Sequence, residues 1–313
     1  MGMTKRSIRL LASITVLGVT VAAFIFYLHA HPDYVTQLLR TQPKWLILIV
    51  SSSLLAVYAL NVLYDVLVRM TGKQLKPTEN ILLTIYSSIA NFFGPLQSGP
   101  GVRAAYLKSK HKVSLRAYFL VTLLYYATFA IINAFCLLVG TRPWWQAVAA
   151  SVAATAVSYG IIRFAASRRT KEVKLLHITP RLVTALILLT ATQVFFIGLR
   201  YYFALQAAHA NVSIGQAISY TGAANFAVFV SITPDGVGIR EAFLLFAQNI
   251  HHVSTHSIVA ANIIDRATFV LFLGILFLVA LGLHAKDRLR ITNKAGGNET
   301  NESIEQDIDS GVV

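Results

Sequence analysis

The sequence has little charge for its length and almost no cysteine. Of its 313 residues, 13% are Asp, Glu, Lys or Arg, about half the share of a soluble domain, whereas 56% are hydrophobic. The single cysteine, Cys136, lies in an apolar run, which excludes an intrachain disulfide and a cysteine-based metal site. Several apolar runs reach the ~20 residues that a helix needs to cross a bilayer. The composition therefore predicts an all-α polytopic membrane protein.

Acidic residues are scarcer than basic ones, and the net charge is +14. The basic residues gather between the apolar runs, which is the positive-inside pattern of membrane proteins and not the pattern of a nucleic-acid-binding surface. No nucleic-acid partner is therefore expected. Residues 1–290 are predicted to form the membrane domain, and residues 291–313 are predicted to be a disordered acidic cytoplasmic tail.

Spacings typical of covalent catalysis are missing from the sequence. No Ser–His–Asp, Cys–His or metalloprotease-type arrangement is present. His252 and His256 have the i, i+4 spacing of a metal site, but no carboxylate or cysteine is nearby, so a plain polar loop is favoured. We therefore expect no enzymatic activity, no metal and no cofactor.

Six apolar runs are long enough to cross a membrane: about 8–28, 45–64, 116–140, 144–164, 181–206 and 257–284. The first run begins like a signal peptide, but its apolar stretch exceeds the ~7–15 residues of a signal core, so it is interpreted as a retained span. Two further stretches, about 80–111 and 215–250, are interrupted by Gly and Pro.

The distribution of Lys and Arg indicates how the two interrupted stretches run. If each enters and leaves on one side of the membrane, 20 of the 27 basic residues fall on the cytoplasmic side. If each is a full span, residues 108–116 and 163–181 move outside with ten of them. Basic residues in short loops set orientation, so we predict two re-entrant hairpins and cytoplasmic termini.

The two interrupted stretches also resemble each other. SSIANFFGPLQSGPGVRAAYL and GAANFAVFVSITPDGVGIREAFL share an ANF, then a Pro, then a G-x-G-[VI]-R-x-A-[YF]-L ending. Their arginines, Arg103 and Arg240, are 137 residues apart, close to half of the membrane portion. Each half, about 8–140 and 144–284, then holds two spans, one hairpin and a third span. Three crossings per half predict two inverted repeats, as in many transporters.

Broken helices at membrane depth indicate a binding site. Unpaired backbone in hydrocarbon costs several kcal/mol, so such breaks lie inside protein or beside a water-filled cavity. The returning half-helix of each hairpin should begin near the midplane, where its free N–H groups, its dipole and an arginine in its first turn favour an anion. The expected ligands of the anionic group are Asn91, Gly99, Gly101, Arg103, Asn225, Gly236, Gly238 and Arg240. The plainer alternative is a loop whose arginines reach the headgroups, but two copies in inverted halves favour a site.

Further charged residues lie at the same predicted depth. Arg200 and Arg266 would add positive charge for a phosphate, and Asp235, Glu241 or Asp265 would balance that charge or carry a proton. A structural ion pair between helices is an equal alternative, because buried charges must be paired. Adjacent helical residues diverge by ~100°, so Asp265 and Arg266 are expected to pair with other residues.

With these residues in place, the chain resembles the integral membrane domain of the lysylphosphatidylglycerol synthase family, also called the flippase-like domain. The resemblance covers about residues 8–284. It rests on the ANF…P…G…R pattern ending at Arg103, on PxGxGxRE ending at Glu241, and on Arg266 in the last span.

The resemblance implies a lipid-handling domain built on inverted halves with re-entrant helices. In its best-known relatives this domain moves an aminoacylated phospholipid between leaflets, and a soluble aminoacyl-transfer domain follows it. This sequence continues instead into the acidic tail, so no transferase activity is expected from it. Asp235 stands where the family usually has a glycine, and Pro100 stands where an acidic residue is common.

Three functions agree with these patterns. The first is a cell-membrane transporter or flippase for an anionic, phosphate-bearing lipid, driven downhill or by an ion gradient. The second is a membrane subunit that presents a lipid to a separately encoded transferase. The third is a lipid-binding protein that does not transport. Assembly into a homo-oligomer stays open in all three.

Overall fold

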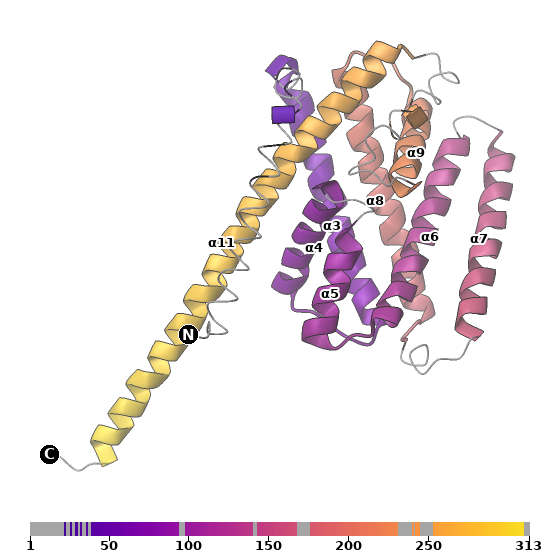
Figure 1. The fold of residues 1–313 in the computed structure, drawn as a ribbon. Coiled ribbons are helices and arrows are strands. Elements are labelled where there is room, and N and C mark those ends of the chain that lie inside the picture. Colours follow the sequence, from indigo (N-terminus) through magenta and orange to yellow (C-terminus); the bar gives the residue numbers. More distant parts are fainter. Residues whose placement is uncertain are drawn as a thin grey trace. The chain divides into compact units, whose positions relative to one another are not determined.

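The computed structural model describes residues 22, 26, 29–30, 32, 36, 39–93, 98–139, 143–167, 176–230, 240, 242–244 and 253–309 (Figure 1). Within these residues every regular element is an α-helix. A helix satisfies all of its backbone hydrogen bonds within one segment, which is what a lipid environment requires. The predicted all-α class is confirmed.

The helices follow one another in the order α3 (Pro43–Met70), α4 (Pro77–Phe93), α5 (Gly99–His111), α6 (Leu115–Val139), α7 (Trp144–Ser167), α8 (Pro180–Ala207), α9 (Ile214–Val230) and α11 (Thr255–Asp309). Several begin with a proline in their first turn, where the missing N–H group has no intrahelical partner to lose. At the start of α8, the Thr179 side chain also accepts a hydrogen bond from the Leu182 N–H group.

Four described helices are long and apolar enough to cross a membrane, over Pro43–Met70, Leu115–Val139, Pro180–Ala207 and Thr255–Leu283. Each coincides with a predicted span. The predicted span 144–164 forms helix α7, which is not among the four, and the predicted span 8–28 lies almost wholly outside the described residues. The count of six spans therefore stays a prediction.

The first interrupted stretch forms two short helices that lie side by side, α4 and α5 (Figure 1). At 1.5 Å per residue, the 13 residues of α5 extend about 20 Å, which is too short to cross ~30 Å of hydrocarbon. Gly99 permits the close approach, because a Cβ atom there would overlap the Ser87 carbonyl oxygen and the Asn91 amide. These lengths agree with a hairpin that does not span the membrane.

The second interrupted stretch is described in part. It contains the 17-residue helix α9 and helical backbone at residues 240 and 242–244. The residues between them, 231–239, lie outside the described part of the chain. The prediction that the second hairpin is inverted relative to the first is therefore neither confirmed nor contradicted.

Helices α3 and α8, the second predicted span of each half, share the most extensive contact in the fold (Figure 1). One buried cluster lies around α3 and includes Leu63, Leu67 and Leu107, and the other lies around α8 and α9 and includes Ala204 and Ala224. Small residues let helix backbones approach closely where lipid removes the hydrophobic drive for association. The α3–α8 contact thus joins the two halves.

The chain divides into two compact units, Met1–Leu273 and Gly274–Val313. The second unit is the continuation of α11, which is helical through Asp309. The disorder that the sequence predicts for residues 291–313 stays a prediction.

Gly222 sets the distance between α9 and α6. A Cβ atom at this position would overlap backbone atoms of α6, among them the Asn133 carbonyl oxygen and the Leu137 nitrogen. Gly198, in α8, is different, because its Cβ would lie 3.6 Å from the nearest Thr221 atom, an ordinary contact distance. Two mid-helix glycines thus have opposite tolerance for a methyl group.

We predict that Gly222→Ala destabilises the protein and that Gly198→Ala does not. The first change forces α9 away from α6 and should cost about 1–3 kcal/mol, whereas the second should be neutral or stabilising by up to about 1 kcal/mol. Thermal unfolding of the purified variants in detergent measures both. Equal melting temperatures for the two variants would contradict the close α6–α9 contact.

A polar cluster ties the two ends of the first hairpin together. The Glu79 carboxylate, at the start of α4, accepts hydrogen bonds at 2.5 Å from Tyr106, at 2.7 Å from His111 and at 3.0 Å from Lys110, all near the end of α5. Burial by itself would raise the pKa of Glu79, but these hydrogen bonds lower the pKa to about 2. The ionised carboxylate therefore holds α4 and α5 together.

We predict that Glu79→Gln lowers the free energy of unfolding by about 1 kcal/mol at neutral pH. The expected loss is smaller than the pKa shift alone implies, because solvent screens the charges at this polar end of the hairpin. Because folding lowers this pKa from 4.5 to about 2, the stabilisation is complete above pH 4.5 and is lost as the pH falls toward 2. The difference in melting temperature between wild type and variant should shrink over that range. Asp65→Asn, which breaks an exposed pair with Arg69, is the control and should change little.

Candidate anion-binding site

Arg103 is the most deeply buried charge of the first half. Its side chain is 0% exposed, and its guanidinium carbon lies 3.9 Å from the centroid of the Tyr64 ring of α3. It donates hydrogen bonds to the Asn80 side-chain oxygen at 3.1 Å and to the Thr84 hydroxyl at 3.4 Å. Its Nε atom has no hydrogen-bond partner.

The groups around Arg103 are neutral. Asn61 of α3 accepts hydrogen bonds from the side chains of Asn80 and Thr84 and so orients both toward the guanidinium. Within the described residues no carboxylate lies within ion-pair distance of Arg103. A buried guanidinium is expensive to desolvate, and an aromatic face and two amide or hydroxyl oxygens offset only part of that cost. The site therefore retains a positive charge that an anion could neutralise.

Arg240 is held by a carboxylate instead. Its NH2 atom donates to the Asp265 Oδ2 atom at 2.6 Å, and both side chains are almost fully buried. Arg200 of α8 shares the same carboxylate, with its Nε atom 2.8 Å from Oδ1 and its NH2 atom 3.3 Å from Oδ2. Asp265 thus bridges two arginines from different segments. This agrees with the expectation that Asp265 pairs with residues other than its neighbour Arg266.

An aromatic contact links this ion-paired cluster to the first hairpin. The guanidinium of Arg200 lies 4.6 Å from the centroid of the Phe269 ring, and Phe269 packs against Phe92 at a centroid distance of 5.8 Å. Phe92 is close to the end of α4, directly before the interruption. The end of α4 and the Asp265 cluster are therefore neighbours in space.

The arginine–tyrosine contact occurs twice, at the same sequence spacing. Arg240 lies over the Tyr201 ring at 4.9 Å, as Arg103 lies over the Tyr64 ring. Tyr201 follows Tyr64 by 137 residues, and Arg240 follows Arg103 by the same number. The duplication seen in the two hairpin motifs thus extends into α3 and α8.

Other predicted site residues have contacts within the protein. Asn91 accepts a hydrogen bond from the Gly99 N–H group at 2.7 Å, which caps the start of α5. Gly101 is exposed, with open space where a side chain would lie. Asn225 donates to the Asn133 side chain of α6 at 2.8 Å. Their role toward a ligand stays a prediction.

The remaining predicted residues divide into two groups. Arg266 is 4% exposed and lies next to Asp265 in α11. Asp235, Gly236, Gly238 and Glu241 lie outside the described residues. Sequence reasoning missed the residues that contact Arg103 and Arg240, namely Tyr64, Asn80, Thr84 and Tyr201, and it missed Asn133, the partner of Asn225. The 137-residue spacing could have identified the two tyrosines.

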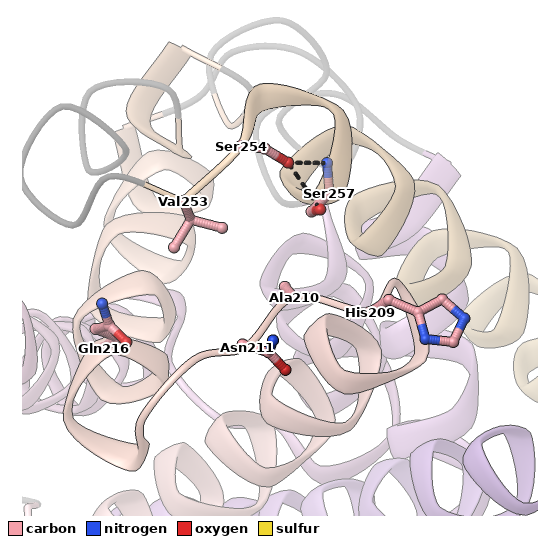
Figure 2. A pocket seen from close by; sticks show the side chains of 7 residues that line it. All are labelled: His209, Ala210, Asn211, Gln216, Val253, Ser254 and Ser257. Atoms are coloured by element: carbon pink, nitrogen blue, oxygen red, sulfur yellow. Dashed lines mark hydrogen bonds between the residues drawn. The ribbon is translucent and has the colours of Figure 1, made fainter.

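The described residues contain no cluster of His, Cys, Asp and Glu able to hold a metal ion. They do contain a polar pocket of about 270 Å³ where α8 ends and α9 and α11 begin (Figure 2). The Ser254 hydroxyl accepts a hydrogen bond from the Ser257 N–H group and so caps α11, and Gln216 accepts a hydrogen bond from the Ser213 N–H group at the start of α9. None of the described residues that line this pocket is an arginine or a lysine, so it lacks the permanent positive charge found at the buried arginines.

We predict that Tyr64→Leu destabilises the protein by about 2 kcal/mol, the contribution of a desolvated cation–π contact, and that Tyr64→Phe has little effect because the ring is kept. Thermal unfolding in detergent measures the difference. Tyr58→Leu, an exposed tyrosine on the same helix, is the matched control. Equal stability of the Leu and Phe variants at position 64 would show that the ring does not hold Arg103.

The comparisons with known proteins agree with the helical, membrane-spanning character of the chain. A comparison with individual curated proteins found no match. A family model described as the lysylphosphatidylglycerol synthase TM region matches residues 10–277, which is most of the chain and most of its apolar part. The protein therefore belongs to the family of lysylphosphatidylglycerol synthase transmembrane regions.

Proposed function

We propose that this membrane protein binds a phosphate-bearing lipid at its buried arginines and moves it between the leaflets. Membership of a lipid-related membrane family supports a lipid as the ligand. The observation that carries the proposal is Arg103, a fully buried guanidinium that has only neutral partners, and no partner for its Nε–H group, among the residues that the structure describes. An anionic headgroup is the ligand that such a group binds best.

The predicted architecture supports movement as well as binding. Two inverted halves of three spans each would place one hairpin on each side of the membrane, and α3 and α8 would form the surface on which the halves move. Arg103 and Arg240, each over a tyrosine of one of these helices, would then supply positive charge to the headgroup site from the two halves. Rocking of one half against the other would expose the headgroup to each leaflet in turn.

The absence of a recognised nucleotide-binding motif in the sequence favours passive or ion-driven exchange. Asp265 is the buried carboxylate available among the described residues, and Asp235 and Glu241 are the other predicted carriers. We propose a plasma-membrane location with both termini in the cytoplasm, from the distribution of Lys and Arg. The chain itself would carry out no covalent chemistry.

Leaflet exchange in liposomes tests the proposal. The purified protein is reconstituted with fluorescent phosphatidylglycerol or phosphatidylcholine, and the accessible fraction is followed by dithionite quenching. We predict exchange of the anionic lipid by the wild type, and loss of at least about tenfold in rate for Arg103→Gln and Arg240→Gln, because each removes one buried positive charge from the proposed site. Arg103→Lys, which keeps the charge, should retain part of the rate.

Arg69→Gln is the matched control, because it removes an arginine that is half exposed and distant from the cluster in sequence. Its rate should equal that of the wild type. If the folded wild type exchanges neither lipid while anionic lipid still copurifies with it, transport is wrong, and presentation to a transferase or binding without transport becomes the better function. Equal exchange by wild type and both Gln variants would contradict the arginine site.

A further inference from the structure

Asp265 is bound as a phosphate would be bound. Its two oxygens lie between guanidinium groups from two different segments, with Arg240 on Oδ2 and Arg200 on both oxygens. Two arginines around one planar anion form the arrangement with which proteins hold carboxylate and phosphate groups alike. Among the described residues, Asp265 is the one carboxylate that contacts these two arginines.

The three side chains of this cluster differ in their exposure. The Arg200 side chain is 11% exposed, whereas the side chains of Asp265 and Arg240 are 1% and 2% exposed. A ligand that approaches the cluster therefore meets Arg200 first. Arg200 is also the more weakly hydrogen-bonded partner, because its bond to Oδ2 is 3.3 Å long and its Nε atom, although 2.8 Å from Oδ1, has no well-aligned hydrogen bond.

The hydrogen bond between Arg240 and Asp265 is shorter than the one between Arg200 and Asp265. Arg240 donates to Oδ2 at 2.6 Å, and its guanidinium also lies over the Tyr201 ring. If the Asp265 carboxylate loses one of its two arginine partners, we expect it to lose Arg200, the more exposed of the two. Arg200 would remain in place on the Phe269 ring, with its N–H groups directed toward the position that the carboxylate had occupied.

We infer that Asp265 is an internal competitor of the ligand, and that a phosphate monoester or diester displaces its carboxylate from Arg200 while Arg240 keeps it. The inference rests on the proposed function, since it names the position where the lipid phosphate binds. Arg200 is then a ligand-binding residue, and Asp265 keeps its charge neutralised when no ligand is bound. Displacement of the carboxylate from Arg200 would also affect the first hairpin, because the Phe269 ring contacts both Arg200 and Phe92.

The inference makes an uncommon prediction, namely that removal of a buried acid improves binding. Asp265→Asn takes away the competing charge and should lower the dissociation constant for a phosphate ligand on the order of tenfold, the effect of one opposing charge at a partly buried site. Titration calorimetry of the purified full chain in detergent measures this, with dioctanoyl phosphatidic acid and inorganic phosphate as separate titrants. If the variant binds both titrants more tightly, the phosphate group alone is recognised. If it binds only the lipid more tightly, the acyl chains are also needed.

Asp65→Asn is the control, because it removes one acid from an exposed pair elsewhere on the chain, and it should bind as the wild type does. Equal or weaker binding by folded Asp265→Asn overturns the inference, while measurable binding by the wild type leaves the proposed function standing. Loss of all phosphate binding in the wild type and in Asp265→Asn overturns both.

A second variant is useful because Asp265→Asn could fail to fold. Arg200→Gln leaves Asp265 and Arg240 as a balanced pair, so the fold should persist. We expect it to bind dioctanoyl phosphatidic acid at least about tenfold more weakly than the wild type, since one charge-assisted contact is lost. Unchanged binding by Arg200→Gln overturns the inference independently of the Asp265 variant.

Discussion

Burial of positive charge is the constraint on which the rest of this structure depends. A guanidinium placed among apolar helices is stable only if rings, amides or carboxylates offset its lost hydration. The hairpin bearing Arg103 is accordingly packed against Tyr64 and Asn61 of α3, and the segment bearing Arg240 against Tyr201 of α8. The α3–α8 contact thereby becomes the common support of both arginines, and its geometry determines where their charges lie.

The all-helical class, four of the spans and the short lengths of α4 and α5 were predictable, because they follow from apolar run length and from Gly and Pro. The partners of the arginines were not predictable from those rules. Nothing in the local pattern distinguishes Tyr64 from an exposed tyrosine such as Tyr58, since burial depends on contacts with segments distant in sequence. The 137-residue spacing between the two hairpin motifs would have identified Tyr64 and Tyr201 as a matching pair if it had also been applied to the preceding spans.

The predicted roles of the glycines and asparagines show a different limit. Gly99 and Asn91 were predicted from an anion-binding motif, and in the structure they bring α5 against α4 and cap its first turn. The same residue types serve a helix start whether or not a ligand binds there, because both uses satisfy free N–H groups. A motif of this kind identifies the break in the helix more securely than it identifies the ligand.

The two halves have diverged in how they neutralise the same arginine. At the 137-residue spacing, Asn61 and Asn80 of the first half correspond to Gly198 and Ala217, so the second half has no amides at those positions for Arg240. Its carboxylate, Asp265, corresponds to Thr128, and Arg200 corresponds to Leu63. One arginine therefore retains uncompensated charge, while the other shares a charged partner. A headgroup that moved between them would pass between two chemically different sites, one with neutral partners and one with a carboxylate beside the arginine.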